Sequence, residues 1–142
     1  MSLQLASADL NDVEFLAAFH ACSLPPSCFH HADHLRLAWL HLHQQPLEAV
    51  ITNVCSGIQV YAKHLGKPEI YHETLTVAWV RLLASHDEPT FDEFLRVNDH
   101  RLNRELLHRF WSPERLQSEQ ARREWLAPDK TSLPSPARIT RQ

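Results

Sequence analysis

The sequence predicts an all-α fold, a compact single-domain bundle of five to seven helices. Apolar residues recur every three or four positions, as in amphipathic helices, and strict two-residue alternation is scarce. Only two glycines occur, Gly57 and Gly66, and the Asn-Gly and Asp-Gly dipeptides of tight hairpins are absent. The 142 residues, of which 44% are hydrophobic, suffice for one domain with one core.

Nine prolines separate the predicted helices. In chain order, we expect helices at about 9–22, 31–44, 46–65, 69–85 and 90–110, the last with a bend near 98–99, and a short helix at 118–126. Residues 1–127 then form the helical domain. Residues 128–142 are rich in proline and serine and are expected to form an irregular tail.

Local signals indicate the faces and ends of these helices. The first is expected to bury Val13, Leu16, Ala17 and His20, and the third Leu47, Ile51, Val54, Ile58, Tyr61 and Leu65. N-cap signals stand at Ser7 or Asp9, Thr90, Ser112 and Ser118. Gly66 occupies a position typical of a left-handed helix end, and Pro68 follows it.

The stretch 29–43, FHHADHLRLAWLHLH, holds five histidines in fifteen residues. At about 100° per residue, His31 and His34 lie along the apolar face, one turn apart. Asp33 and Arg36 fall on the opposite, polar face. The pair His30/His34, at i,i+4, is the alternative on geometry alone.

Another histidine, His72, falls on the apolar face of the fourth predicted helix, close to the start of that helix. A buried imidazole needs a polar partner, and three of them on two helices can satisfy one another through a cation. We therefore predict a divalent metal, zinc, iron or nickel, held by His31, His34 and His72. Glu73 is the candidate fourth ligand or catalytic general base.

The remaining histidines are expected to be structural. Six of them are predicted to lie at the surface: His41, His43, His64, His86, His100 and His108. The zinc-protease pattern HExxH is absent, because no histidine stands three residues after Glu73.

Charge and cysteine usage narrow the class of protein. The net charge of −3 and the lack of a basic run weigh against nucleic-acid binding. No apolar run is long enough for a transmembrane helix or a signal peptide, so no membrane association is expected. Three cysteines without a CxxC pair indicate a reduced, cytoplasmic chain.

Three blocks of sequence carry a resemblance. They are Phe29-His30-His31-Ala32-Asp33-His34-Leu35-Arg36 with Ala38-Trp39; Tyr71-His72-Glu73-Thr74-Leu75-Thr76; and Ser112-Pro113-Glu114-Arg115-Leu116 with Ala121-Arg122, Trp125, Pro128-Asp129 and Leu133-Pro134. The chain resembles a group of small bacterial helical proteins that share F-x-H-x-x-H-L-R-x-A-W and Y-H-x-T-x-T motifs. The resemblance implies a helical fold and favours His31/His34 over His30/His34, but it implies no reaction. DinB-type helical proteins, which hold a metal with three histidines from two helices, are more loosely similar.

Two functions follow from these residues. The first is a metal-dependent enzyme acting on a small-molecule substrate, in which metal-bound water with a pKa of about 7 performs a hydrolysis or iron uses oxygen. The alternative is a non-catalytic ligand-binding or protein-interaction module, whose core histidines respond to pH between about 5 and 7. No oligomeric state is predicted.

Overall fold

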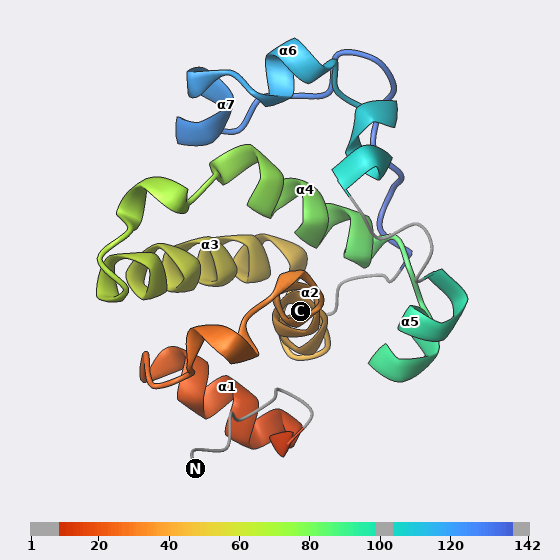
Figure 1. Ribbon diagram of the computed structural model, residues 1–142. Helices are drawn as coiled ribbons and strands as arrows, with labels where there is room; N and C mark the ends of the chain where they lie inside the picture. Colours follow the sequence, from red (N-terminus) through yellow and green to blue (C-terminus); the bar gives the residue numbers. More distant parts are fainter. Residues whose placement is uncertain (1–8, 99–103, 138–142) are drawn as a thin grey trace.

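The computed structural model describes residues 9–98 and 104–137, and these residues form helices, turns and loops with no strand (Figure 1). The helices are α1 (Asp12–His20), α2 (His31–Leu42), α3 (Leu47–His64), α4 (Glu73–Ala84), α5 (Phe91–Asn98), α6 (Pro113–Leu116) and α7 (Glu119–Arg123). The described residues also form short 3₁₀ helices, namely η2 (Pro26–Cys28), η3 (Pro68–Ile70) and η5 (Arg104–Arg109). The predicted all-α bundle of five to seven helices is confirmed.

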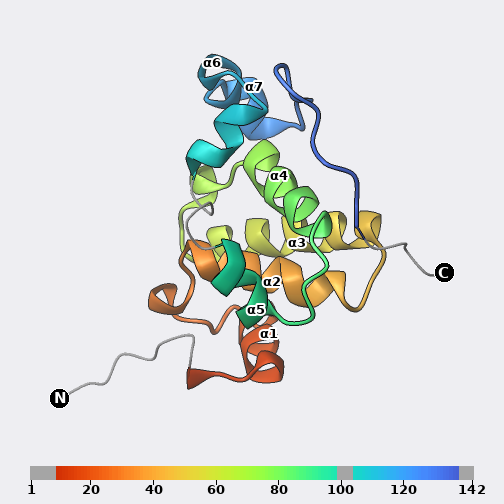
Figure 2. The same ribbon diagram turned by 90° about the vertical axis from the view of Figure 1, so that its right-hand side faces the viewer.

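Helix α4 is central to the arrangement. It packs against α2 and α3 on one side and against α7 on the other, while α1 packs beneath α3. Figures 1 and 2 show the resulting order from α1 at the bottom, through α2 and α3, to α4 and then α6 and α7 at the top, with α5 at one side. None of the described helices is long and apolar enough to cross a membrane.

Two hydrophobic clusters share α4. The larger unites α1 to α5 and includes Phe15, Phe19, Leu35, Trp39, Val50, Val54, Tyr61, Val80, Leu83 and Phe94. The smaller lies between α4 and the 107–116 region and consists of Ala78, Leu82, Leu107, Phe110, Trp111 and Leu116. Because successive turns of α4 serve both clusters, this helix is apolar around most of its circumference.

Several local signals produce the predicted structure. Gly66 has φ of +75°, the left-handed conformation that glycine adopts without steric cost. The hydroxyls of Ser112 and Ser118 accept hydrogen bonds from the first turns of α6 and α7. The α3 stripe is confirmed, since Val54, Ile58 and Tyr61 are buried and its other predicted members pack against the same cluster.

The predicted buried face of α1 is wrong. Val13 is 77% exposed, whereas Phe15 and Phe19 are buried. Two phenylalanines one turn apart bury more apolar area than the predicted stripe, and the guanidinium of Arg36 covers the Phe15 ring at 4.4 Å. The N-cap is Asn11, which forms a capping box with Glu14.

Helix α4 starts four residues later than predicted. Pro68–Ile70 form a separate 3₁₀ turn, and His72 is extended, with φ −136° and ψ 111°, as the N-cap residue. The last helix likewise ends at Arg123 rather than near residue 126.

Thr74, in the first turn of α4, fastens the C-terminal part of the chain. Its side chain is fully buried, and its hydroxyl donates to the carbonyl oxygen of Glu124 at 2.7 Å. The hydroxyl oxygen of Thr74 also accepts a hydrogen bond from the backbone N–H of Leu126 at 3.1 Å. One hydroxyl thus satisfies two backbone groups beyond the end of α7.

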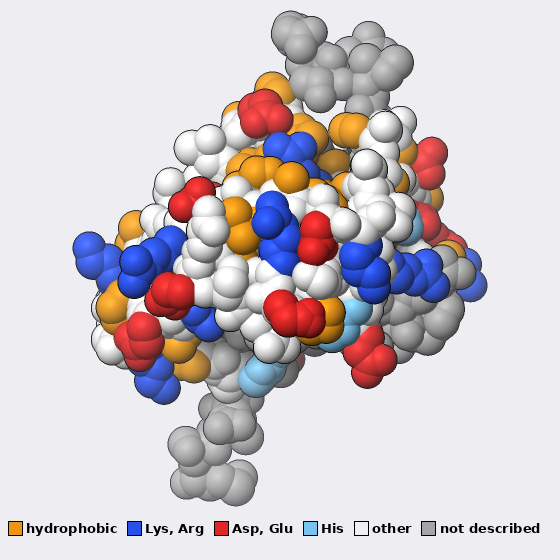
Figure 3. Space-filling model, turned by 90° about the horizontal axis from the view of Figure 1, so that it is seen from above, with side chains coloured by type: hydrophobic (Ala, Val, Ile, Leu, Met, Phe, Trp, Pro, Cys, Tyr) orange, Lys and Arg blue, Asp and Glu red, His pale blue; other side chains and the backbone are white. Residues whose placement is uncertain are grey.

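Residues 127–137 have no regular structure, but they return along the molecule. The backbone N–H of Lys130 donates to the carbonyl of Phe110, and that of Ala137 donates to the carbonyl of Ala84 at the end of α4. Leu133 packs against the smaller cluster. Figure 3 views the molecule from above, over α6 and α7, where basic and acidic side chains are interspersed.

Replacing Thr74 by valine is expected to lower the free energy of unfolding by about 1–3 kcal/mol, because it keeps the side-chain shape but removes the bond to the Glu124 carbonyl and leaves the buried N–H of Leu126 without its partner. Denaturant unfolding of the purified protein measures the change. Thr76→Val is the matched control, because the Thr76 hydroxyl bonds only to the His72 carbonyl in its own helix; we expect a loss below about 1 kcal/mol. Equal losses for the two variants would contradict the role of Thr74.

Candidate ligand pocket

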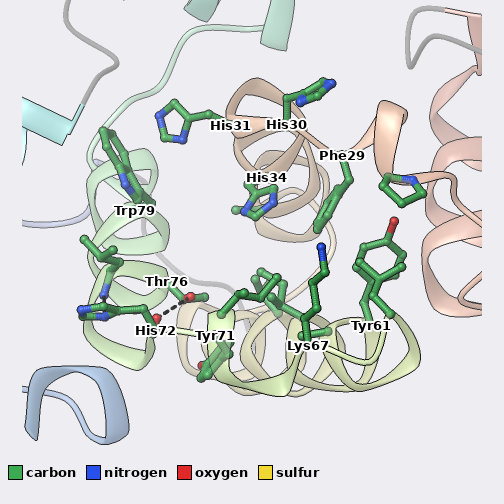
Figure 4. A pocket seen from close by; sticks show the side chains of 18 of the residues that line it. Phe29, His30, His31, His34, Tyr61, Lys67, Tyr71, His72, Thr76 and Trp79 are labelled. Atoms are coloured by element: carbon green, nitrogen blue, oxygen red, sulfur yellow. Dashed lines mark hydrogen bonds between the residues drawn. The ribbon is translucent and has the colours of Figure 1, made fainter. Parts of the chain in front are cut away.

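A pocket of about 680 Å³ lies between α2, α3, η3 and α4 (Figure 4). Its wall is largely apolar and is formed by Pro26, Phe29, Ala38, Val54, Ile58, Ala62, Leu65, Ile70, Leu75, Trp79 and Val80. The polar lining residues are His30, His31, His34, Tyr61, Lys67, Tyr71, His72 and Thr76. The volume and the few polar groups in an apolar wall are typical of small-molecule sites.

His34 stands at the centre of the pocket in Figure 4. Its ring stacks on Phe29 with centroids 4.0 Å apart. Burial, followed by repulsion from His31, lowers the pKa of His34 from the ordinary 6.5 to about 4, although the nearby Asp33 acts in the opposite direction. At neutral pH this imidazole is therefore uncharged, with one nitrogen able to donate and one able to accept.

His31 is exposed at the rim of the pocket, although its helical phase predicted a place in the core. Its ring meets Trp79 of α4 edge-on, with centroids 4.8 Å apart. Asp33, expected on the polar face, is instead buried, because its carboxylate accepts from the backbone N–H of His30 at 2.8 Å and caps α2.

His72 has both ring nitrogens engaged by the backbone. Nδ1 accepts from the N–H of Leu75 at 3.1 Å, which caps α4. Nε2 lies 3.0 Å from the carbonyl oxygen of Leu116 and carries the proton that it donates there. This imidazole is thereby fixed as a neutral tautomer that joins α4 to α6.

Glu73 does not line the pocket. Its carboxylate accepts a short hydrogen bond from the hydroxyl of Tyr71, which also interacts with the thiol of Cys55. Burial raises the pKa of Tyr71 far above its ordinary value and raises that of Cys55 to about 11. Phenol and thiol therefore keep their protons at neutral pH, and the Glu73 carboxylate is used to hold the start of α4.

The three predicted metal ligands border one pocket but do not form one cluster. Among the residues that the structure describes, no group of three or more His, Cys, Asp or Glu side chains is arranged to hold a metal ion. The start of α2 lies against the second turn of α4, where His31 meets Trp79, whereas His72 stands before the first turn and points to α6. Metal binding by His31, His34 and His72 stays a prediction.

The other histidines divide between surface and core. His43 and His64 are exposed, as predicted. The prediction for His41 is wrong: it is 5% exposed, and its Nδ1 lies 2.9 Å from the carbonyl oxygen of Leu37, one turn earlier in α2. A backbone carbonyl thus engages Nδ1 of this ring, and the ring also meets that of His20 in α1 edge-on, with centroids 5.3 Å apart. His100 lies outside the described residues.

Two polar residues of the pocket had no signal in the sequence. Tyr61 was predicted only as a core residue, yet its hydroxyl donates to the carbonyl of Leu24 at 2.7 Å and ties the loop before η2 to α3. Lys67 follows Gly66 in a short turn, and only the left-handed turn brings it to the pocket rim. No motif distinguishes it from a solvated lysine.

Comparison with known proteins yields no match to a protein-family model, a curated protein or a solved structure. The functional argument therefore depends on the pocket itself.

The lowered pKa of His34 predicts a defined loss of stability in acid. Because the folded state binds this proton less readily than the unfolded state, the contribution is complete above pH 6.5 and is lost as the pH falls toward 4. The slope from this residue reaches about 1.4 kcal/mol per pH unit. Between pH 6.5 and 4, denaturant unfolding should show a smaller slope for His34→Asn than for the wild type.

His64→Asn, on the exposed end of α3, is the control and should keep the wild-type slope. Histidine side-chain NMR gives an independent value. A titration midpoint for His34 at or above 6 would contradict the buried, neutral state.

Proposed function

We propose that the protein binds a small organic molecule in the pocket between α2, α3 and α4. The observation that carries this proposal is a cavity of about 680 Å³ whose apolar wall surrounds one uncharged imidazole, His34. Burial of an apolar ligand surface supplies affinity, and the imidazole supplies direction through one donor and one acceptor.

The electrostatics of His34 favour binding over acid–base catalysis. An effective general base has a pKa close to the working pH, whereas that of His34 is about 4. At neutral pH its imidazole is ready to form hydrogen bonds but is a weak proton acceptor. Ligand binding without catalysis is therefore the function that this pocket supports best.

Thr76→Phe is expected to abolish ligand binding, because it places an aromatic ring in the pocket. In two-dimensional amide NMR, a library of small organic molecules should shift the signals of His34, Thr76 and Trp79 in the wild type. Thr52→Phe, on the exposed side of α3, should retain these shifts. Absence of shifts in the wild type at millimolar concentration, or their persistence in Thr76→Phe, would contradict the proposal.

A divalent metal at His31 and His34 is the second candidate, with His72 and Glu73 as the further ligands that the sequence predicts. Two observations favour this candidate. The imidazoles of His31 and His34 are close enough to repel each other electrostatically when protonated, and His34 is neutral, which is the form of histidine that binds metals. Such a site would bind zinc, iron or nickel and support a metal-dependent enzyme.

Metal analysis of protein purified without an affinity tag tests this candidate. We expect about one equivalent of metal and a metal-dependent rise in melting temperature, both lost in the double variant His31→Ala, His34→Ala. Adding His72→Ala to His31→Ala tests the third ligand. Less than about a tenth of an equivalent, with no shift in melting temperature, would remove the metal proposal.

We further place the protein in the cytoplasm. Within the described part of the chain, no disulfide joins Cys22, Cys28 or Cys55, which suits a reducing compartment.

A further inference from the structure

The charge of the pocket lining differs from that of the whole chain. The chain carries a net charge of −3, yet the described residues that line the pocket include four histidines and one lysine and no aspartate or glutamate. Asp33 and Glu73, which adjoin lining residues in the sequence, are already engaged, since Asp33 caps α2 and Glu73 accepts from Tyr71. Protonation of a lining histidine adds positive charge, and no carboxylate in the lining offsets it.

Lys67 provides the permanent charge. It lies in the turn between α3 and η3, and Figure 4 shows its side chain extending from that turn toward Phe29 and His34. No ion pair joins it to any carboxylate in the described parts of the chain. The ammonium group is therefore available to a ligand at the rim.

The apolar part of the lining indicates what kind of molecular body the ligand has. Behind Lys67 and His34 lie aliphatic side chains of α3, among them Val54 and Ile58, and the indole of Trp79 on α4. A flat aromatic or aliphatic body is buried favourably against these groups. A cationic ligand would be repelled by Lys67, and no carboxylate in the pocket lining would offset this repulsion.

We infer that the pocket selects organic monoanions, with the apolar body between α3 and α4 and the anionic group between Lys67 and His34. This inference rests on the proposed binding function and adds the chemical class of the ligand. Lys67 contributes a charge-assisted hydrogen bond, and the neutral imidazole of His34 donates a second one from its N–H.

Two fluorescent probes with the same aromatic body test the inference. 8-Anilinonaphthalene-1-sulfonate carries one negative charge, and N-phenyl-1-naphthylamine lacks the sulfonate. The wild-type protein should bind the anionic probe about two- to fivefold more tightly, as expected for one ion pair at a partly exposed site. Lys67→Met, which keeps the length of the side chain, should remove this preference and leave the affinity for the neutral probe unchanged.

Lys63→Met is the matched control, because Lys63 is exposed in the last turn of α3, shortly before Lys67, and does not line the pocket. It should preserve the preference for the anionic probe. Far-UV circular dichroism of each variant checks that the fold is intact. Since Lys67 is exposed, its substitution removes no core contact.

The possible failures are distinguishable. Equal affinity of the wild type for both probes, or equal losses in Lys67→Met and Lys63→Met, would overturn the selection of anions while leaving the binding pocket in place. Binding of neither probe, or binding of both that survives in Thr76→Phe, would overturn the pocket and with it the proposed function.

Discussion

The hydrogen bonds at the start of α4 hold together the two halves of this molecule. Any helix begins with backbone N–H groups that have no partner within it. Here the imidazole of His72 satisfies one of them and turns its other nitrogen to the carbonyl of Leu116. Thr74 and Arg122 add bonds in both directions, the latter donating to the carbonyls of Glu69 and Tyr71. Polar side chains here add to the small apolar contact that helices as short as α6 and α7 offer.

This arrangement explains why the pocket has its chemistry on one side only. The first turn of α4 is committed to joining α6 and α7, so its polar groups face away from the cavity or are already bonded. Leu75 and Thr76, at the end of that turn, and Trp79 in the next turn line the pocket, and the Thr76 hydroxyl is already bonded to the His72 carbonyl. The uncommitted polar groups come from the opposite wall, from the start of α2 and from the turn after α3. A ligand would thus be oriented by His34 and Lys67 and packed against α4.

Helical periodicity and end signals predicted the fold class and most helices, because they depend on neighbours within one or two turns. The face of α1 was predicted wrongly because Phe15 and Phe19 bury more apolar area than the predicted stripe, whereas the errors for Asp33 and His41 share another reason. A helical wheel assigns polar residues to solvent, whereas a carboxylate that caps a helix, or an imidazole bonded to a carbonyl one turn back, is buried with its partner. Likewise, the wheel placed His72 within a helix, but its imidazole serves as the cap that starts it.

The candidate site was predicted in part. His31, His34 and His72 do border a single pocket, although His31 lies exposed at its rim and His72 precedes the helix on which it was placed. The sequence carried no information on the distance between the starts of α2 and α4, because this depends on how far the helices slide along one another. Nor did it indicate Lys67, whose position depends on a single left-handed residue, Gly66.

The bonds at the start of α4 also impose an order on biosynthesis. The carbonyls and N–H that His72 and Thr74 engage lie 44 to 52 residues further along the chain. On a ribosome, α1 to α4 emerge first and can bury the larger cluster, but the α4 face that later receives α6 and α7 remains open to water. During that interval the nascent chain exposes Ala78 and Leu82 of the unfinished smaller cluster. A chaperone that recognises apolar helical surface would find its binding site there, until residues 107–126 arrive and close it.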